Sequence, residues 1–264
     1  MNNDKDNTFG NEYTPDKMKF LNFIYLNSKL FDAFSLSFLG ILSGNQKEEG
    51  SNTVYGLGTF GPYLKYKSQK FYAQVNAFYQ TGTNIESQEV SAYLLNAKAT
   101  FQATSKINIG AGFDLISGNY NSDSIKDHSF DLLYGTRHGF NGEMDLFSNL
   151  LKSTLDAGLI DFYASFGIKL NPKNSILLTY HNFSLHKIAY NNTDEKINKK
   201  PLGNELDLNY KYKSELPLEC TVGICVYKST ESMKTIQSIP NSDNTFNYYS
   251  YIMLTFTPEL FSSK

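Results

Sequence analysis

The sequence predicts an all-β fold, an antiparallel up-and-down transmembrane β-barrel, from three observations. Apolar and polar residues alternate with period two in about eleven segments of roughly ten residues, the length that a tilted barrel strand needs. The gaps between segments are alternately short and long, which is typical of barrels with tight periplasmic turns and long outer loops. Aromatic residues make up 15% of the chain while hydrophobic residues make up only 41%, as expected when every second strand residue faces lipid.

The strands expected from this alternation cover most of the chain, which is interpreted as a single β-barrel domain spanning residues 1–264. Short connections rich in turn-forming residues, such as NPKN at 171–174, separate paired segments. The stretch 118–157 is expected to be a long structured loop, extracellular or folded into the lumen, with a short amphipathic helix at 144–155. The predicted strands are 18–27, 33–43, 55–67, 71–79, 90–102, 107–117, 158–170, 175–186, 203–213, 218–227 and 246–257.

The direction of the strands bears on whether the barrel is complete. If the tight turns are periplasmic, the first strand starts on the outer side, whereas barrels have an even number of strands with both ends inside. An odd number of N-terminal strands is therefore expected to be missing; the alternatives are a different strand count or a smaller closed barrel. The chain opens with polar MNNDKDNTFGNEYTPD, which is not a signal peptide, and no run approaches the ~20 apolar residues of a spanning helix.

The alternation assigns the two faces of each strand. In the segment 203–213, Leu206 and Leu208 fall on one side, and Glu205 and Asp207 fall on the other. A lysine facing lipid near the middle of the bilayer costs ~2–4 kcal/mol, so the polar set is expected to face a water-filled lumen. A soluble barrel or sandwich is the alternative, with the polar set outside. Among the other assigned residues, Phe162 and Phe166 lie on the apolar side, and Asp161 and Lys169 on the polar side.

Inward-facing acids and inward-facing lysines lie toward opposite ends of the predicted strands. The acids lie near the long-loop ends, and the lysines lie toward the tight turns. Such a lumen would be basic on its periplasmic side and would concentrate anionic solutes. The alternative is that lysines near turns only extend into solvent. The acids are Asp114, Asp161, Glu205 and Asp207, and the lysines are Lys65, Lys67, Lys98, Lys169, Lys211 and Lys213.

The segment 130–147 reads FDLLYGTRHGFNGEMDLF and contains Arg137, the only arginine of the chain, followed by His138. One interpretation places the guanidinium at a constriction, where it would bind a carboxylate through two parallel hydrogen bonds. The other has Arg137 pairing with Asp131, Glu143 or Asp145 to hold the loop together. We call this segment the 130–147 motif, and its further residues of interest are Tyr134, Gly135, Thr136, Phe140, Gly142 and Asp145.

Several functional classes find no support in the sequence. The net charge of −2 offers no basic field for nucleic acid. Cys220 and Cys225 lie five residues apart on one predicted strand, which places them on opposite faces, and the same holds for His181 and His186. No nucleophile elbow, phosphate-binding glycine loop or metal-ligand cluster is present. No enzymatic activity, catalytic residue, cofactor or metal is therefore predicted.

The 130–147 motif resembles that of the alginate-export family of bacterial outer-membrane porins. The resemblance extends to FGPYLKYK, VSAYLLNAKATFQ, GAGFDLISG, GLIDFY, TYHNF and MLTFTPELF. It implies a barrel of about 18 strands, with about seven upstream of Met1, in contact with outer-membrane lipid. It also implies a channel for diffusion or export of sugars, oligosaccharides or an anionic polysaccharide. The alternatives are a structural or ligand-binding barrel without flux and a barrel-embedded hydrolase; the oligomeric state is left open.

Overall fold

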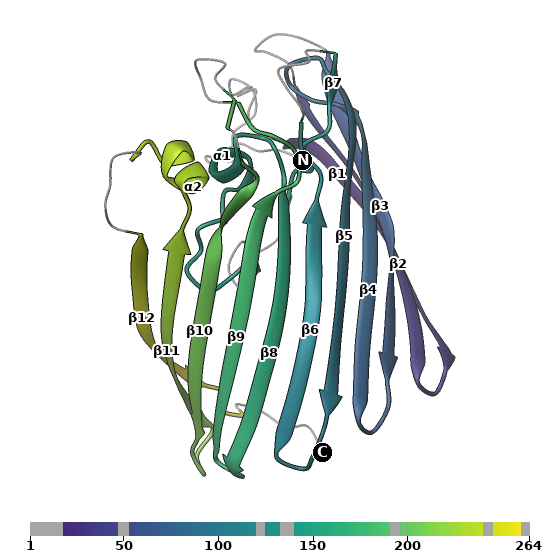
Figure 1. Cartoon of the computed structure of the whole chain (residues 1–264). Helices are drawn as coiled ribbons and strands as arrows, with labels where there is room; N and C mark the ends of the chain where they lie inside the picture. The colour runs from purple at the N-terminus through teal and green to yellow at the C-terminus, as the bar shows by residue number, and fades with distance from the viewer. Residues whose placement is uncertain are drawn as a thin grey trace, which may run out of the picture.

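The chain forms one antiparallel up-and-down sheet of eleven long strands in chain order, with a two-residue strand added beside β5 (Figure 1). This computed structural model describes residues 18–46, 53–119, 125–132, 140–190, 196–197, 199–239 and 245–259. The all-β, up-and-down prediction is confirmed, with strand ends shifted by a few residues. The strands are β1 (Met18–Phe31), β2 (Phe34–Gln46), β3 (Val54–Lys67), β4 (Phe71–Thr83), β5 (Glu89–Gln102), β6 (Ile107–Ile116), β7 (Lys126–Asp127), β8 (Leu159–Asn171), β9 (Asn174–Leu185), β10 (Pro201–Lys213), β11 (Leu218–Ser229) and β12 (Phe246–Phe256).

Tight turns join the strands at one end of the sheet, and longer connections join them at the other (Figure 1). The β8–β9 turn shows why the short connections fold locally. The side-chain oxygen of Asn171 accepts hydrogen bonds from the backbone N–H groups of Lys173 and Asn174, each at 2.9 Å. An asparagine side chain that takes over the role of a backbone acceptor stabilises such a turn.

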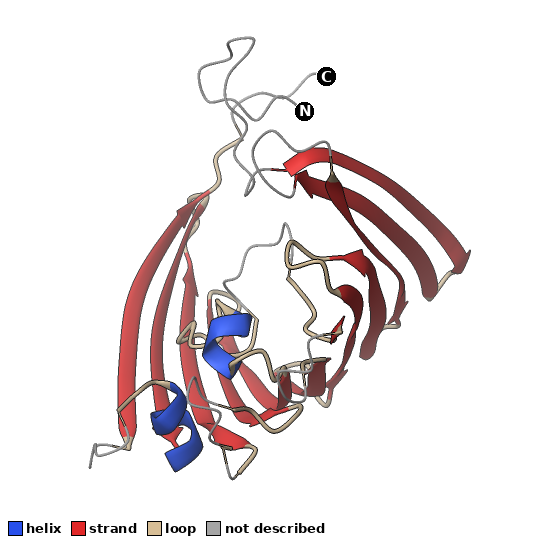
Figure 2. Cartoon of the chain, turned by 90° about the horizontal axis from the view of Figure 1, so that it is seen from above, coloured by secondary structure: helices blue, strands red, loops and turns tan. Residues whose placement is uncertain are grey.

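The sheet is strongly curved and remains open within the described residues (Figure 2). β1 pairs only with β2, and β12 pairs only with β11, so each has one unpaired edge there. Because eleven long strands alternate in direction, β1 and β12 run the same way. Antiparallel closure would therefore need an odd number of additional strands between them.

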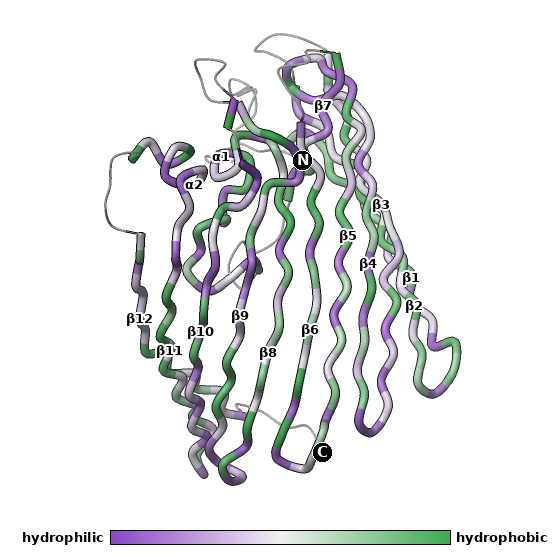
Figure 3. The backbone as a smooth tube through the Cα atoms, viewed as in Figure 1, coloured by the Kyte–Doolittle hydropathy of each residue, from purple (hydrophilic) through white to green (hydrophobic). Residues whose placement is uncertain are grey.

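The two faces of the sheet differ in chemistry as the sequence predicts. On the convex face Phe162 is 56% exposed and Leu206 43%, whereas the concave-face Asp161 and Glu205 are 0% and 1% exposed. Hydropathy alternates along the strands in Figure 3. The inverted arrangement, in which the apolar side chains occupy a dry centre, is thus excluded for these strands.

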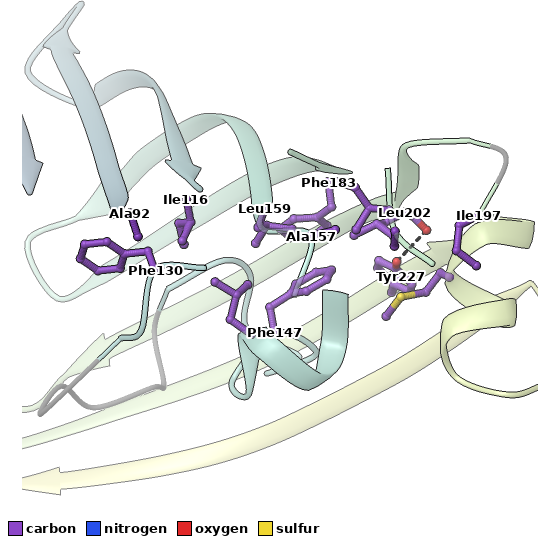
Figure 4. Packing of buried hydrophobic residues seen from close by; sticks show 14 of the residues in the cluster. Ala92, Ile116, Phe130, Phe147, Ala157, Leu159, Phe183, Ile197, Leu202 and Tyr227 are labelled. Carbon is purple, nitrogen blue, oxygen red and sulfur yellow. Dashed lines mark hydrogen bonds between the residues drawn. The ribbon is translucent and has the colours of Figure 1, made fainter. Parts of the chain in front are cut away.

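A hydrophobic core nevertheless fills the long-connection end of the concave face (Figure 4). Phe130 and Phe147 point from the 118–157 stretch toward the strand ends, and the ring of Phe147 lies 4.7 Å from that of Phe183 on β9. We call residues 125–132 and 140–157 the inner loop. The buried core residues are Val90, Ala92, Ile116, Phe130, Phe147, Leu150, Ala157, Leu159, Phe183, Leu185, Ala189, Ile197, Leu202, Tyr227 and Met233.

The helix predicted at 144–155 is shorter than expected. α1 spans only Leu150–Thr154, capped by the Asn149 side chain, which accepts from the Lys152 backbone N–H. It ends because Leu155 adopts a left-handed conformation with φ of 49°. α2 (Glu231–Ile236) follows β11. Neither helix, nor any other in the described part of the chain, has the length and apolar character to cross a membrane.

Candidate functional site on the concave face

A row of polar side chains crosses the concave face from β1 to β8. Its members are direct cross-strand partners, so they share one level of the sheet. Hydrogen bonds link many of them, including Ser37 Oγ to Asn27 Oδ1 at 3.1 Å and Asn76 Nδ2 to Asn96 Oδ1 at 3.1 Å. We call this set the polar row: Asn27, Ser37, Tyr63, Asn76, Asn96, Asp114 and Asp161.

The polar row ends in a group of acids around one histidine. His181 Nδ1 lies 2.8 Å from Asp161 Oδ2, and its ring stacks on Phe183 at 5.5 Å with an interplanar angle of 8°. Its other ring nitrogen lies 3.7 Å from Asp207 Oδ2. The imidazole of His181 therefore faces inward and is hydrogen-bonded. The contacts on both nitrogens hold the imidazole between β8 and β10.

Next to this group the inner loop docks onto Glu205 of β10. One carboxylate oxygen, Glu205 Oε1, accepts from the backbone N–H groups of Glu143 and Met144, at 2.7 and 2.9 Å. Gly142 makes this approach possible, because its φ is +85° and a Cβ there would lie 2.6 Å from Glu205 Oε1. Glycine is the residue that tolerates both this conformation and this close contact.

The side chain of Glu143 attaches the same loop to two further positions. Glu143 Oε1 accepts from Asn209 Nδ2 of β10 at 2.7 Å, and Glu143 Oε2 accepts from the Tyr251 hydroxyl of β12 at 2.7 Å. Together with the two bonds to Glu205, these contacts form what we call the loop clamp: Gly142, Glu143, Met144, Glu205, Asn209 and Tyr251. Four hydrogen bonds thus join the loop to β10 and β12, so the clamp holds the loop against the wall.

A second anchor holds the other part of the inner loop. The side-chain amide of Gln80 on β4 donates to the Asp131 backbone oxygen and accepts from the Asp131 backbone N–H, both at 2.8 Å. The Ser117 hydroxyl also donates to the backbone oxygen of His128 at 2.8 Å. The inner loop is therefore fastened to strands on both sides of the concave face.

The inner loop covers three of the predicted acids, so their side chains are not exposed to solvent. Asp161, Glu205 and Asp207 face inward as expected, but they are buried among protein groups rather than lining an open passage. Both oxygens of Asp207, one of Asp161 and one of Glu205 accept no hydrogen bond in the described part of the chain. No set of three His, Cys, Asp or Glu residues among the described residues is arranged to hold a metal ion.

The predicted lysines lie on the strands toward the tight turns. Lys211 and Lys213 both approach Glu219, at 2.6 and 3.7 Å, while Lys98 and Lys169 are exposed. Lys65 is half-buried beside the polar row. Their contact with solute stays a prediction.

The residues of the 130–147 motif divide between described and undescribed positions. Tyr134, Gly135, Thr136, Arg137 and His138 lie outside the described residues. Phe140 is exposed, Gly142 belongs to the clamp, and Asp145 has a positive φ of 55°.

Sequence reasoning identified some clamp residues and missed another. The sequence predicts Glu143 only as a partner for Arg137, and Asn209 shares the inward parity of Glu205 and Asp207. Tyr251 was not singled out, although alternation in 246–257 places it on the concave side opposite Gly223. The cysteines behave as expected: Cys220 and Cys225 are free and lie on opposite faces.

The fold and site define an all-β protein whose curved up-and-down sheet carries a docked inner loop on its polar face. No protein-family model matches the chain, and no curated protein is significantly similar to it in sequence. Among solved structures, LpxR from Salmonella typhimurium is similar with a TM-score of 0.34 and 10% identity. That match covers 90% of this chain and 88% of LpxR.

His186, at the long-connection end, should make this corner sensitive to acid. Gly118 N–H donates to its Nδ1 at 3.3 Å, and its Nε2 lies 3.1 Å from the Tyr93 hydroxyl, contacts that suit the neutral ring. Burial, followed by the charges of Lys187 and Lys200, lowers its pKa from 6.5 to about 4. Because the unfolded state binds the proton more readily, the stabilisation is present above pH 6.5 and is lost as the pH falls toward 4.

Thermal unfolding in detergent at about pH 7 and about pH 5, on either side of the ordinary histidine pKa, tests this expectation. The loss of stability between the two values should be larger in the wild type than in His186→Gln, whose amide cannot titrate. Equal losses in both proteins would show that His186 does not contribute to the acid sensitivity.

Proposed function

We propose that the chain forms the wall of an outer-membrane β-barrel channel, through which sugars, oligosaccharides or other small polar solutes diffuse. The observation that carries the proposal is the segregation of the two faces. Large apolar side chains are exposed along the convex face of every long strand, while buried acids such as Asp161, Glu205 and Asp207 face inward. A continuous apolar surface of this extent suits lipid and would promote aggregation in water.

Membrane insertion also constrains the two unpaired edges. Backbone N–H and C=O groups without partners cost several kcal/mol each in hydrocarbon, so spanning sheets are closed. The proposal therefore includes pairing of the free edges of β1 and β12 with further strands in the membrane.

The inward groups support a polar solute. The polar row offers amides, hydroxyls and a phenol, and lysines accumulate toward the tight turns. Hydrogen-bonding groups and fixed charges along a pore wall select solutes by their polarity and charge. The resemblance to alginate exporters adds anionic saccharides as the expected class, with the inner loop as the constriction.

The loop clamp favours a second candidate, a ligand-binding or structural barrel without flux. An inner loop fastened on both sides of the concave face narrows the space that a solute could cross. The two candidates differ in one measurable property, because only the channel carries ions through a membrane.

Recording from planar lipid bilayers that contain the purified protein tests the proposal. Stepwise currents are expected, with a reversal potential in a salt gradient that indicates anion preference. A clear cation preference would contradict the part of the proposal that assigns anionic solutes to the channel. Folded protein that floats with liposomes yet conducts nothing would contradict the channel and leave the barrel without flux.

A further inference from the structure

A recess of about 310 Å³ opens on the concave face of β1–β4. We call it the β1–β4 recess. Its volume lies at the lower end of the range for small-molecule pockets, about 300–1,000 Å³, so it suits one small ring. The lining residues are Tyr25, Asn27, Ser35, Ser37, Leu39, Gly61, Tyr63, Lys65 and Phe78.

Gly61 keeps the floor of the recess free of a side chain. A Cβ at this position would lie 1.8 Å from the backbone oxygen of Ala77 on the neighbouring strand, so no larger residue fits. The next residue, Pro62, has no N–H to donate to the sheet. The floor is therefore bare backbone between the flanking side chains.

Two tyrosine rings beside this floor are held in place through their hydroxyl groups. Tyr25 donates to Ser37 Oγ at 3.3 Å, and Tyr63 donates to Gln74 Oε1 at 3.2 Å. Rings held in this way present apolar faces at little further entropic cost on binding. Phe78 adds a third aromatic surface.

Lys65 supplies the only charge among the lining residues. Unlike Lys211 and Lys213, which share Glu219, it makes no ion pair or hydrogen bond with the described residues. The Asn27 amide nitrogen likewise donates no hydrogen bond there, because its side chain is engaged only through Oδ1. The ammonium of half-buried Lys65 and an amide donor without acceptors form a site for an anionic oxygen group.

From this geometry we propose that the β1–β4 recess binds a small ring carrying a carboxylate. The carboxylate pairs with Lys65 and accepts from Asn27, and the ring packs between Tyr25 and Tyr63. A sugar acid and an aromatic acid share this chemistry. The proposal does not depend on flux, since the recess is formed by four strands of the sheet alone.

Isothermal titration calorimetry on the detergent-solubilised chain, with glucuronate and benzoate as probes, tests the assignment. Each acid should bind more tightly than its neutral counterpart, glucose or benzyl alcohol, and the acid that binds more tightly identifies the source. No measurable binding of either acid would overturn the proposal. If the protein conducts ions but binds neither acid, the proposed site in the recess is refuted and the channel is not. If it binds an acid but does not conduct, the channel is refuted and the site in the recess is not.

Lys65→Gln should weaken binding of the tighter acid about tenfold or more, as expected for loss of a charge-assisted contact. Lys70→Gln is the matched control, because Lys70 is exposed in the β3–β4 turn and lies outside the recess; the affinity of this variant should stay within about twofold of the wild type. Lys65→Arg should retain binding. Equal losses in Lys65→Gln and Lys70→Gln would assign the affinity to general charge and contradict a site at the recess.

Discussion

Gly142→Ala should release the inner loop from the sheet. The added methyl carbon would lie 2.6 Å from the Glu205 carboxylate and overlap it, and alanine disfavours the φ of +85°. The left-handed conformation alone costs about 1–2 kcal/mol, and losing two backbone hydrogen bonds to a carboxylate adds on the order of 1–3 kcal/mol each. Amide hydrogen exchange at Glu143 and Met144 should accelerate, and the free energy of unfolding should fall.

Gly56→Ala is the matched control for this substitution. Gly56 lies in β3, and a Cβ there would meet no atom within 4 Å, so the stability of this variant should change little. If the Glu143 and Met144 amides stay protected in Gly142→Ala, the clamp does not depend on close approach at this glycine. In the proposed channel, release of the loop should also raise the single-channel conductance.

In the proposed membrane barrel, Val75→Lys should destabilise the protein far more than the same substitution one residue further on. Val75 is 51% exposed on the convex face of β4, whereas Asn76 belongs to the inward polar row. A lysine facing lipid near the bilayer centre costs about 2–4 kcal/mol, while a lysine facing an aqueous interior costs little. The free energy of unfolding from liposomes, measured by denaturant titration, should therefore fall by about that amount only in Val75→Lys.

Asn76→Lys controls for the loss of local packing and of strand propensity, because the two residues occupy the same depth of the same strand. Its own expected cost is that of one hydrogen bond to Asn96, about 0.5–1.5 kcal/mol. Equal destabilisation by both substitutions would mean that the convex face is not in lipid, and the membrane placement would fail with it.

Sequence reasoning was most accurate where the signal repeats along the chain. In β10 the alternation of Leu206 and Leu208 with Glu205 and Asp207 predicted both the strand and its faces. It was least accurate in the inner loop, where no period exists. There the helix expected at 144–155 is observed only over Leu150–Thr154, because the left-handed conformations of Leu155 and Asp156 end it.

The inward acids show the same limit at the candidate site. Their side of the strand followed from parity, but their burial depends on a loop that approaches from far along the chain. The bond from Tyr251 to Glu143 joins residues 108 positions apart, and the bond from Asn209 joins residues 66 apart. Nothing in the local sequence of β10 or β12 indicates such a partner.

The sequence by itself determined the eleven long strands, their order and the chemistry of their two faces. Period-two alternation is a local property, and a one-residue change of register would reverse every side chain. The tertiary structure decided that Glu205 receives the Gly142–Met144 backbone, that His181 lies between Asp161 and Asp207, and that a recess opens at Gly61. These contacts depend on how a curved sheet brings distant strands and a folded loop together, which no single segment encodes.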